Sequence, residues 1–191
     1  MLIGKEPEER KWNVHCTFWL PIEGLAERSV TDHVPYDQWT SQGFITTTPG
    51  KSISYEYVAA HLMQEFSAYN IAKLAFDRWN MKHLRPWLLR AGFSEEMIEG
   101  RFVEFGQGMQ SMSPALRDLE QVLLEGELAH GGNPVLSMCA ANSIVVLDDA
   151  GNRKLSKRKS IGRIDGMVAL AMAIGVAPLG GDDLDMGALI A

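Results

Sequence analysis

Two aspartates, Asp77 and Asp165, lie at positions from which a carboxylate could do chemistry. Asp77 directly follows the apolar segment 71–76, IAKLAF, which predicts a buried strand. The residues after the carboxyl end of a parallel strand enter the crevice where open α/β sheets bind ligands, so Asp77 is a candidate site residue. The alternative is that Asp77 only caps the helix that the next residues predict.

The second aspartate lies within the first two turns of a predicted helix over residues 161–177. Its neighbours Ile161 and Val168 are apolar, as is most of the helix. A carboxylate on a buried helix needs a partner or a cation, which makes Asp165 a candidate metal ligand. The alternative is an acid at the solvent edge, favoured by the dipole at the helix N-terminus.

The segment just before Asp165 is strongly basic, although the net charge of the chain is −6. Between positions 153 and 163 it carries no acid and six basic residues: Arg153, Lys154, Lys157, Arg158, Lys159 and Arg163. The simpler alternative is a solvated hairpin, but such a cluster also makes a local positive field that suits phosphate backbones. Paired carboxylates beside it are what metal-assisted phosphodiester hydrolysis needs, with two hard divalent cations about 4 Å apart on oxygen ligands.

Length, hydrophobic content and cysteine count restrict the classes of protein to which this chain can belong. With 191 residues and 46% hydrophobic content, the chain is long enough for one compact domain with a sizeable core. Two distant cysteines indicate a reducing compartment and cannot supply the paired ligands of a zinc finger. No apolar run reaches the length of a membrane span, so we expect no membrane partner.

The order of predicted elements indicates a mixed sheet flanked by helices. Hairpins are predicted over residues 1–20 and around Gly151, and strands over 44–48, 71–76 and 101–105. Helices are predicted over 54–70, capped by Ser54, over 81–91, over 113–126 and over 161–177, capped by Ser160. Strands that alternate with helices indicate an α/β fold. Residues 178–191 are acidic and rich in glycine, and we expect a flexible tail there.

Several stretches, in the same order, resemble the nuclease domain of tailed-phage (HK97-like) terminase large subunits. They are FWLP (18–21), VPYDQW…QGFITTTPG (34–50), LAFDRWN (74–80), QGMQSMSPALRDLE (107–120), GELAHGGNPVL (126–136) and KSIGRIDGMVALAMA (159–173). Together they span nearly the whole chain up to about residue 177. Each stretch is weakly specific by itself, and the set is highly specific.

The resemblance implies an RNase H-like fold for residues 1–177 and a metal-dependent endonuclease, with Mg²⁺ or Mn²⁺, that cuts concatemeric double-stranded viral DNA. Of the family's three acids, the second matches Asp77 and the third matches Asp165. The first lies on a strand that would precede residue 1 and would lie beside the strand ending at Asp77, so we expect this chain to lack that strand and the N-terminal ATPase domain. The basic residues expected to bind DNA are Lys154, Lys157, Arg158, Lys159 and Arg163. The implied partners are DNA, the portal protein, the terminase small subunit and sister large subunits, in the cytoplasm of the bacterial host cell.

Two other functions stay open at this point. One is an inactive, truncated prophage remnant or a docking module, which would keep the surface for DNA or portal and do no chemistry. The other is a different RNase H-like nuclease, such as a junction resolvase. With one of three acids absent, we expect the 191-residue chain to cleave plasmid DNA poorly or not at all.

Overall fold

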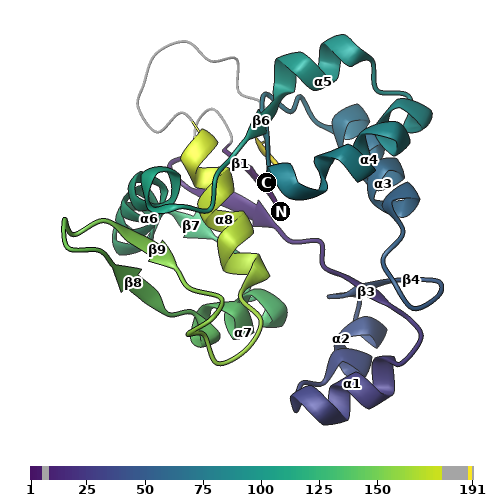
Figure 1. Ribbon diagram of the computed structural model, residues 1–191, viewed down its shortest axis with the longest axis horizontal. Coiled ribbons are helices and arrows are strands. Elements are labelled where there is room, and N and C mark those ends of the chain that lie inside the picture. The colour runs from purple at the N-terminus through teal and green to yellow at the C-terminus, as the bar shows by residue number, and fades with distance from the viewer. Residues whose placement is uncertain (6–8, 178–188, 191) are drawn as a thin grey trace.

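A six-stranded mixed sheet forms the centre of the computed structural model, which describes residues 1–5, 9–177 and 189–190 (Figure 1). The strand order is β6-β5-β10-β1-β2-β7. The strands are β1 (Leu2–Gly4), β2 (Trp12–His15), β5 (Leu74–Phe76), β6 (Phe102–Glu104), β7 (Leu128–Ala129) and β10 (Leu189–Ile190).

The pairing is mixed, as the alternation of strands and helices predicted. β1 and β2 form the expected antiparallel hairpin, and β10 pairs antiparallel with the other edge of β1. β10, β5 and β6 run parallel to one another, with Ile190 opposite Leu74 and Phe76 opposite Glu104. β7, which no local sequence pattern predicts, pairs parallel with β2.

Helices cover both faces of this sheet, and alternating strand residues show which helices cover which face. Leu2 and Leu74 pack in one cluster with residues of α3 (Tyr55–Ala68), α4 (Arg78–Ala91) and α5 (Glu95–Arg101). Their neighbours Ile3 and Ala75 pack in another cluster with α6 (Met109–Leu124) and α8 (Asp165–Val176). Successive side chains of a strand point to opposite faces, so the sheet lies between two helical layers.

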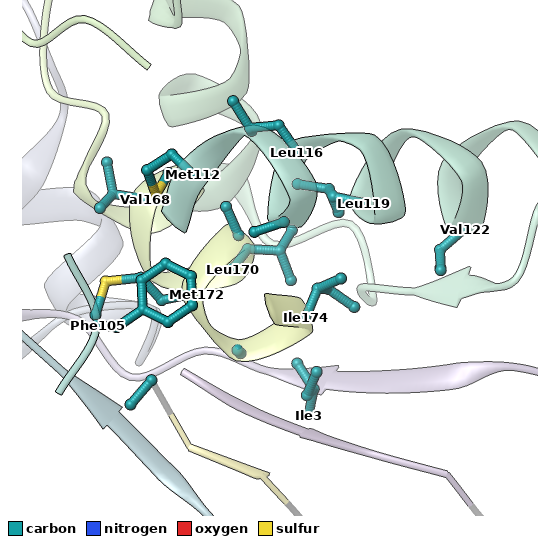
Figure 2. Packing of buried hydrophobic residues seen from close by; sticks show 14 of the residues in the cluster. Ile3, Phe105, Met112, Leu116, Leu119, Val122, Val168, Leu170, Met172 and Ile174 are labelled. Carbon is teal, nitrogen blue, oxygen red and sulfur yellow. The ribbon is translucent and has the colours of Figure 1, made fainter. Parts of the chain in front are cut away.

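Helix α8 is the most buried helix of the described chain, because it lies between α6 and the sheet. Figure 2 shows Leu170 and Ile174 between the α6 residues Leu116 and Leu119 and Ile3 of β1. At Gly175, an added Cβ would lie 2.8 Å from the ring of Phe105 and 2.9 Å from the Cβ of Ala115. A glycine at this position therefore lets α8 and α6 approach closely.

The remaining elements form smaller units beside the main sheet. β3 (Trp19–Pro21) pairs parallel with β4 (Thr46–Thr48), and α1 (Leu25–Asp32) and α2 (Tyr36–Ser41) lie next to this pair (Figure 1). Their small core contains Leu25, Tyr36, Ile45 and Val135, the last of which lies in α7 (Pro134–Asn142). The predicted hairpin around Gly151 consists of β8 (Val145–Leu147) and β9 (Arg153–Leu155).

Several element boundaries differ from the sequence-based expectations. The strand expected over residues 11–20 is two strands, β2 and β3, which lie in different sheets. Helix α6 begins at Met109, so Pro114 lies inside it and not in its first turn. Helix α8 begins at Asp165 and is not capped by Ser160, whose hydroxyl instead donates to the carbonyl of Ser156 and accepts the N–H of Ile144.

Part of the segment expected to be a flexible tail is a strand. Leu189 and Ile190 form β10, in the sheet position beside β5, while residues 178–188 and 191 lie outside the described part of the chain. Among the described residues, no helix has both the length and the apolar character needed to cross a membrane.

Candidate functional site

Asp77 lies where the sequence predicted it, at the carboxyl end of strand β5. Its Oδ1 accepts the backbone N–H of Trp79 at 3.2 Å, so Asp77 is the N-cap of α4. Its Oδ2 accepts a hydrogen bond of 2.6 Å from the side-chain amide of Gln107, in the loop after β6. The capping alternative is therefore confirmed, and the same half-buried carboxylate also faces a cavity.

This first cavity, with a volume of about 310 Å³, contains further polar groups besides Asp77. His61 and Glu65, one turn apart on α3, line it, with His61 Nε2 3.5 Å from Glu65 Oε1. The Trp19 ring meets the His61 ring edge-on at 5.6 Å. Burial lowers the pKa of His61 and favours the neutral imidazole, although Glu65 partly opposes this shift.

Asp165 is the first residue of α8, and its side chain is 62% exposed. The expectation that it is buried among apolar neighbours was wrong, because the helix starts at Asp165 and its buried residues begin with Gly166. Asp165 nevertheless has a cationic partner: Lys157 Nζ lies 2.8 Å from its Oδ1. A carboxylate in the first turn also interacts favourably with the helix dipole.

Asp165 lines a second cavity, with a volume of about 420 Å³ and mostly apolar walls. Gly166 leaves room there, because an added Cβ would lie 3.0 Å from the Phe18 ring. Arg163 lies at the same cavity near Tyr36, whose hydroxyl donates to Asp32 at 3.0 Å. Burial and this hydrogen bond raise the pKa of Tyr36, whereas the guanidinium of Arg163 lowers it.

The two cavities are neighbours that share part of their walls. Met1, Thr17 and Trp19 line both of them. Asp77 therefore lines one of two neighbouring cavities and Asp165 lines the other, although 88 positions separate them in the sequence. Helix α8 also reaches both cavities, since Asp165 lines one and Met172 lines the other.

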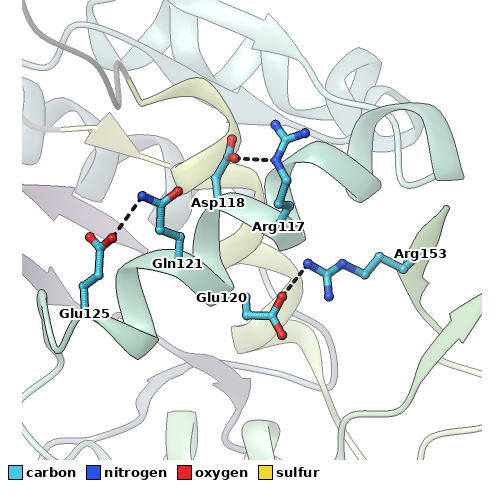
Figure 3. Close-up of polar contacts among 6 residues, drawn as sticks. All are labelled: Arg117, Asp118, Glu120, Gln121, Glu125 and Arg153. Atoms are coloured by element: carbon cyan, nitrogen blue, oxygen red, sulfur yellow. Dashed lines mark hydrogen bonds and ion pairs between the residues drawn. The ribbon is translucent and has the colours of Figure 1, made fainter. Parts of the chain in front are cut away.

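The six basic residues between positions 153 and 163 have different surroundings in the structure. Arg153 of β9 lies 2.6 Å from Glu120 and ties the hairpin to α6 (Figure 3). Lys157 pairs with Asp165, whereas Arg158 and Lys159 are exposed on the turn after β9. Lys154 lies half-buried in β9, and Arg163 is exposed at the second cavity.

Sequence reasoning missed several residues at these two cavities. Gln107 could have been found, since it follows β6, and the carboxyl ends of adjacent parallel strands meet at one edge of the sheet. Lys157 was assigned to DNA alone, although its partner Asp165 is eight residues away. His61 and Glu65 lie inside the helix predicted over residues 54–70, and no local pattern marks either of them as a site residue.

The donor chemistry of the two aspartates suits a hard divalent cation, because carboxylate oxygens are the ligands that Mg²⁺ and Mn²⁺ prefer. Their number is small, however. Within residues 1–5, 9–177 and 189–190, no group of three or more His, Cys, Asp or Glu side chains is arranged to hold a metal ion. The residues present therefore fit the kind of ion and give an incomplete set of ligands for it.

Comparisons with known proteins agree with this picture. The family described as "Terminase large subunit, endonuclease domain" matches residues 7–180. The terminase large subunit of Enterobacteria phage HK97 is 44% identical over 177 residues, which cover 93% of this chain and 34% of that protein. Protein YmfN of Escherichia coli K12 is 25% identical over 179 residues, which cover 88% of this chain and 37% of that protein.

A solved structure gives the same result for the fold. The crystal structure of the HK97 bacteriophage large terminase matches with a TM-score of 0.83 at 44% identity, over 92% of this chain and 36% of that one. The expected RNase H-like fold is thereby confirmed. The chain spans about a third of the length of these relatives. Over nearly all of its length, the chain belongs to the family of terminase large subunit endonuclease domains.

Proposed function

We propose that this domain is a metal-dependent endonuclease that hydrolyses phosphodiester bonds of concatemeric double-stranded viral DNA during phage genome packaging. The observation that carries the proposal is the position of Asp77 in a chain of this family: at the carboxyl end of a central parallel strand, facing a cavity. The portal protein, the terminase small subunit and sister large subunits are the proposed partners, in the cytoplasm of the bacterial host cell.

Asp77 and Asp165 are the residues proposed to hold Mg²⁺ or Mn²⁺. When bound, a pair of such ions activates water and stabilises the leaving oxygen. If Asp77 and Asp165 are the carboxylates that the described residues supply, the remaining coordination positions would be left to water and to phosphate oxygens of the DNA.

The chain's own residues have three proposed tasks around these acids. Gln107 orients Asp77 through its hydrogen bond to Oδ2. Lys157 neutralises Asp165 through its contact with Oδ1, so a cation held by Asp165 would compete with this ammonium group. The turn with Arg158 and Lys159 attracts the DNA backbone close to Asp165.

The test measures Mn²⁺ binding by isothermal titration calorimetry and, separately, nicking of supercoiled plasmid. Asp77→Asn and Asp165→Asn keep the size of the side chain and remove its charge. We expect each to weaken Mn²⁺ binding by at least about tenfold. The control, Asp37→Asn, changes an exposed acid of α2 and should leave both measurements unchanged. Mn²⁺ affinity that is equal in all four proteins would contradict the proposal.

A second function, DNA docking without cleavage, is favoured by one specific observation. Asp165 is already paired with Lys157, and among the described residues no group of three or more His, Cys, Asp or Glu side chains is arranged to hold a metal ion. If the chain binds duplex DNA but does not bind Mn²⁺ and does not nick plasmid, docking is the better assignment. A strong preference for four-way junctions over linear duplex would instead favour a junction resolvase.

A further inference from the structure

The position between β1 and β5 in the main sheet is filled from the far end of the chain. β10 consists of Leu189 and Ile190, and the chain between α8 and β10 lies outside the described residues. Leu189 lies opposite Ile3, and Ile190 lies opposite Leu2 on one side and Leu74 on the other. In the strand order of the sheet, these two residues lie between the pair β6-β5 and the strands β1, β2 and β7.

The two strands that flank β10 are core strands, not exposed edges. Ile3 is 0% exposed and Ala75 is 1% exposed, and Leu2 and Leu74 are also buried. Adjacent strands lie about 4.8 Å apart, so a sheet without β10 would have a gap of about two such spacings between β1 and β5. Buried backbone N–H and C=O groups that face such a gap would lose their partners, which is costly.

The same position adjoins the candidate site. β10 runs parallel to β5, so both strands point toward the sheet edge at which Asp77 lies. The antiparallel strand β1 begins at this edge, and Met1 just before it lines both cavities. A strand that enters or leaves this position therefore changes the backbone next to both cavities.

We propose that the position between β1 and β5 is a strand-acceptor site, which binds an extended apolar segment parallel to β5 and whose occupant in this chain is its own C-terminal strand, Leu189–Ile190. β10 is an exchangeable occupant, because its pairing rests on two residues and a strand this short opens at a low free energy. Recognition follows the usual mode of strand addition, in which main-chain hydrogen bonds to both neighbours provide the affinity. The inference concerns the sheet and holds whether or not the domain cleaves DNA.

The test follows amide hydrogen exchange of Leu2, Ile3 and Leu74 by NMR in the parent chain, two variants and a control. The first variant ends at residue 177, and the second is the full-length double substitution Leu189→Pro/Ile190→Pro, because proline cannot donate to a sheet. The control is Asp183→Ala/Asp185→Ala, which alters the same segment and leaves Leu189 and Ile190 in place. We expect the amides that β10 protects to exchange roughly tenfold faster in both variants and unchanged in the control.

A peptide of residues 183–191 added to the truncated chain should restore the slow exchange, and the same peptide with both prolines should not. If the truncated chain does not fold, the double-proline variant carries the comparison. Equal exchange in the parent and the double-proline variant would overturn the proposal, since β10 would then not hold the position in solution. Protection that rises with protein concentration, together with a dimer in light scattering, would also overturn it, because the strand would then come from a second copy.

Discussion

At the scale of single residues, Asp77 combines two roles that the sequence could only offer as alternatives. One carboxylate oxygen caps α4 and the other binds Gln107, while the group faces the first cavity. A strand followed by an acid predicted the position, because local order is enough to place a residue after a strand. Gln107 comes from a neighbouring strand, so its contact with Asp77 depends on the pairing of β5 with β6.

Substitutions at Asp77 should separate its structural role from its chemical role. Asp77→Ala removes the cap and should lower the free energy of unfolding by about 1 kcal/mol, whereas Asp77→Asn keeps a capping oxygen and should cost much less. Both should weaken Mn²⁺ binding. Urea denaturation measures the first effect and calorimetry the second.

Ser94, the N-cap of α5, provides the matched control for this pair of substitutions. Its side chain accepts the N–H of Met97 at 3.1 Å. Ser94→Ala should lower stability by about 1 kcal/mol as well, with Mn²⁺ binding unchanged. If Asp77→Asn retained full Mn²⁺ affinity, capping alone would explain why an aspartate is at this position.

At the scale of elements, the segment between β9 and α8 determines where α8 begins and therefore whether Asp165 is exposed. Ser160 binds backbone groups of Ser156 and Ile144, so the chain turns there and the helix starts at Asp165. This is why Asp165 is exposed at a helix end, and the apolar pattern of residues 161–177 could not reveal it. The contacts of Ser160 connect residues 16 positions apart, beyond the reach of helical periodicity.

In the turn after β9, Arg158 and Lys159 should contribute more to DNA binding than Lys157. Arg158→Ala/Lys159→Ala should reduce the salt slope of duplex binding by about two, since each phosphate contact contributes about 0.9. Lys157→Ala should add less than one further unit, because Lys157 already pairs with Asp165. Fluorescence anisotropy over a range of salt concentrations measures the slope.

A charge-matched control for the turn lies on the loop before β2. Arg10→Ala/Lys11→Ala removes two exposed cations there and should leave the slope nearly unchanged. If the two double variants reduced the slope equally, net charge alone would govern binding and the turn would be only a solvated hairpin.

The packing of α8 on α6 gives a prediction about stability. Gly175→Ala would place a methyl group within 3.0 Å of Phe105 and Ala115, both buried, and should lower the free energy of unfolding by about 1–3 kcal/mol despite the better helix propensity of alanine. Gly100→Ala, in α5, is the control, because an added Cβ there meets nothing within 4 Å. It should be neutral or stabilising in urea denaturation. A stabilised Gly175→Ala variant would show that α8 can shift away from α6.

At the scale of the whole molecule, the sequence predicted the mixed α/β sheet with its helices, and it did not predict how the sheet is completed. Segments 44–48, 71–76 and 101–105 consist mainly of apolar or β-branched residues, so strands were expected there. β7 and β10 have only two residues each, and their pairing with β2, β1 and β5 comes from distant parts of the chain. Such short strands form through their neighbours and leave little local pattern.

The pH dependence of stability should report the burial of Cys16. Burial raises the pKa of this thiol from 9.0 to about 11. Between these two values the folded chain keeps the proton and the unfolded chain loses it, so stability is complete below about pH 9 and falls as the pH rises through this window. The urea midpoint should therefore fall less between about pH 8 and pH 10 in Cys16→Ala than in the parent. If the urea midpoint fell equally in both proteins, other groups, such as Tyr36, would determine the pH dependence of stability.

The pairing of β10 with β1 has a consequence for how the polypeptide could be rewired. Leu2 and Ile190 are opposite each other on antiparallel strands, so their Cα atoms are about 5 Å apart. A two-residue hairpin turn such as Asn-Gly can join strands in this arrangement. Linking the strands in this way and opening the chain at Gly151, in the exposed β8–β9 turn, would produce a circular permutant in which β10 and β1 form one continuous hairpin.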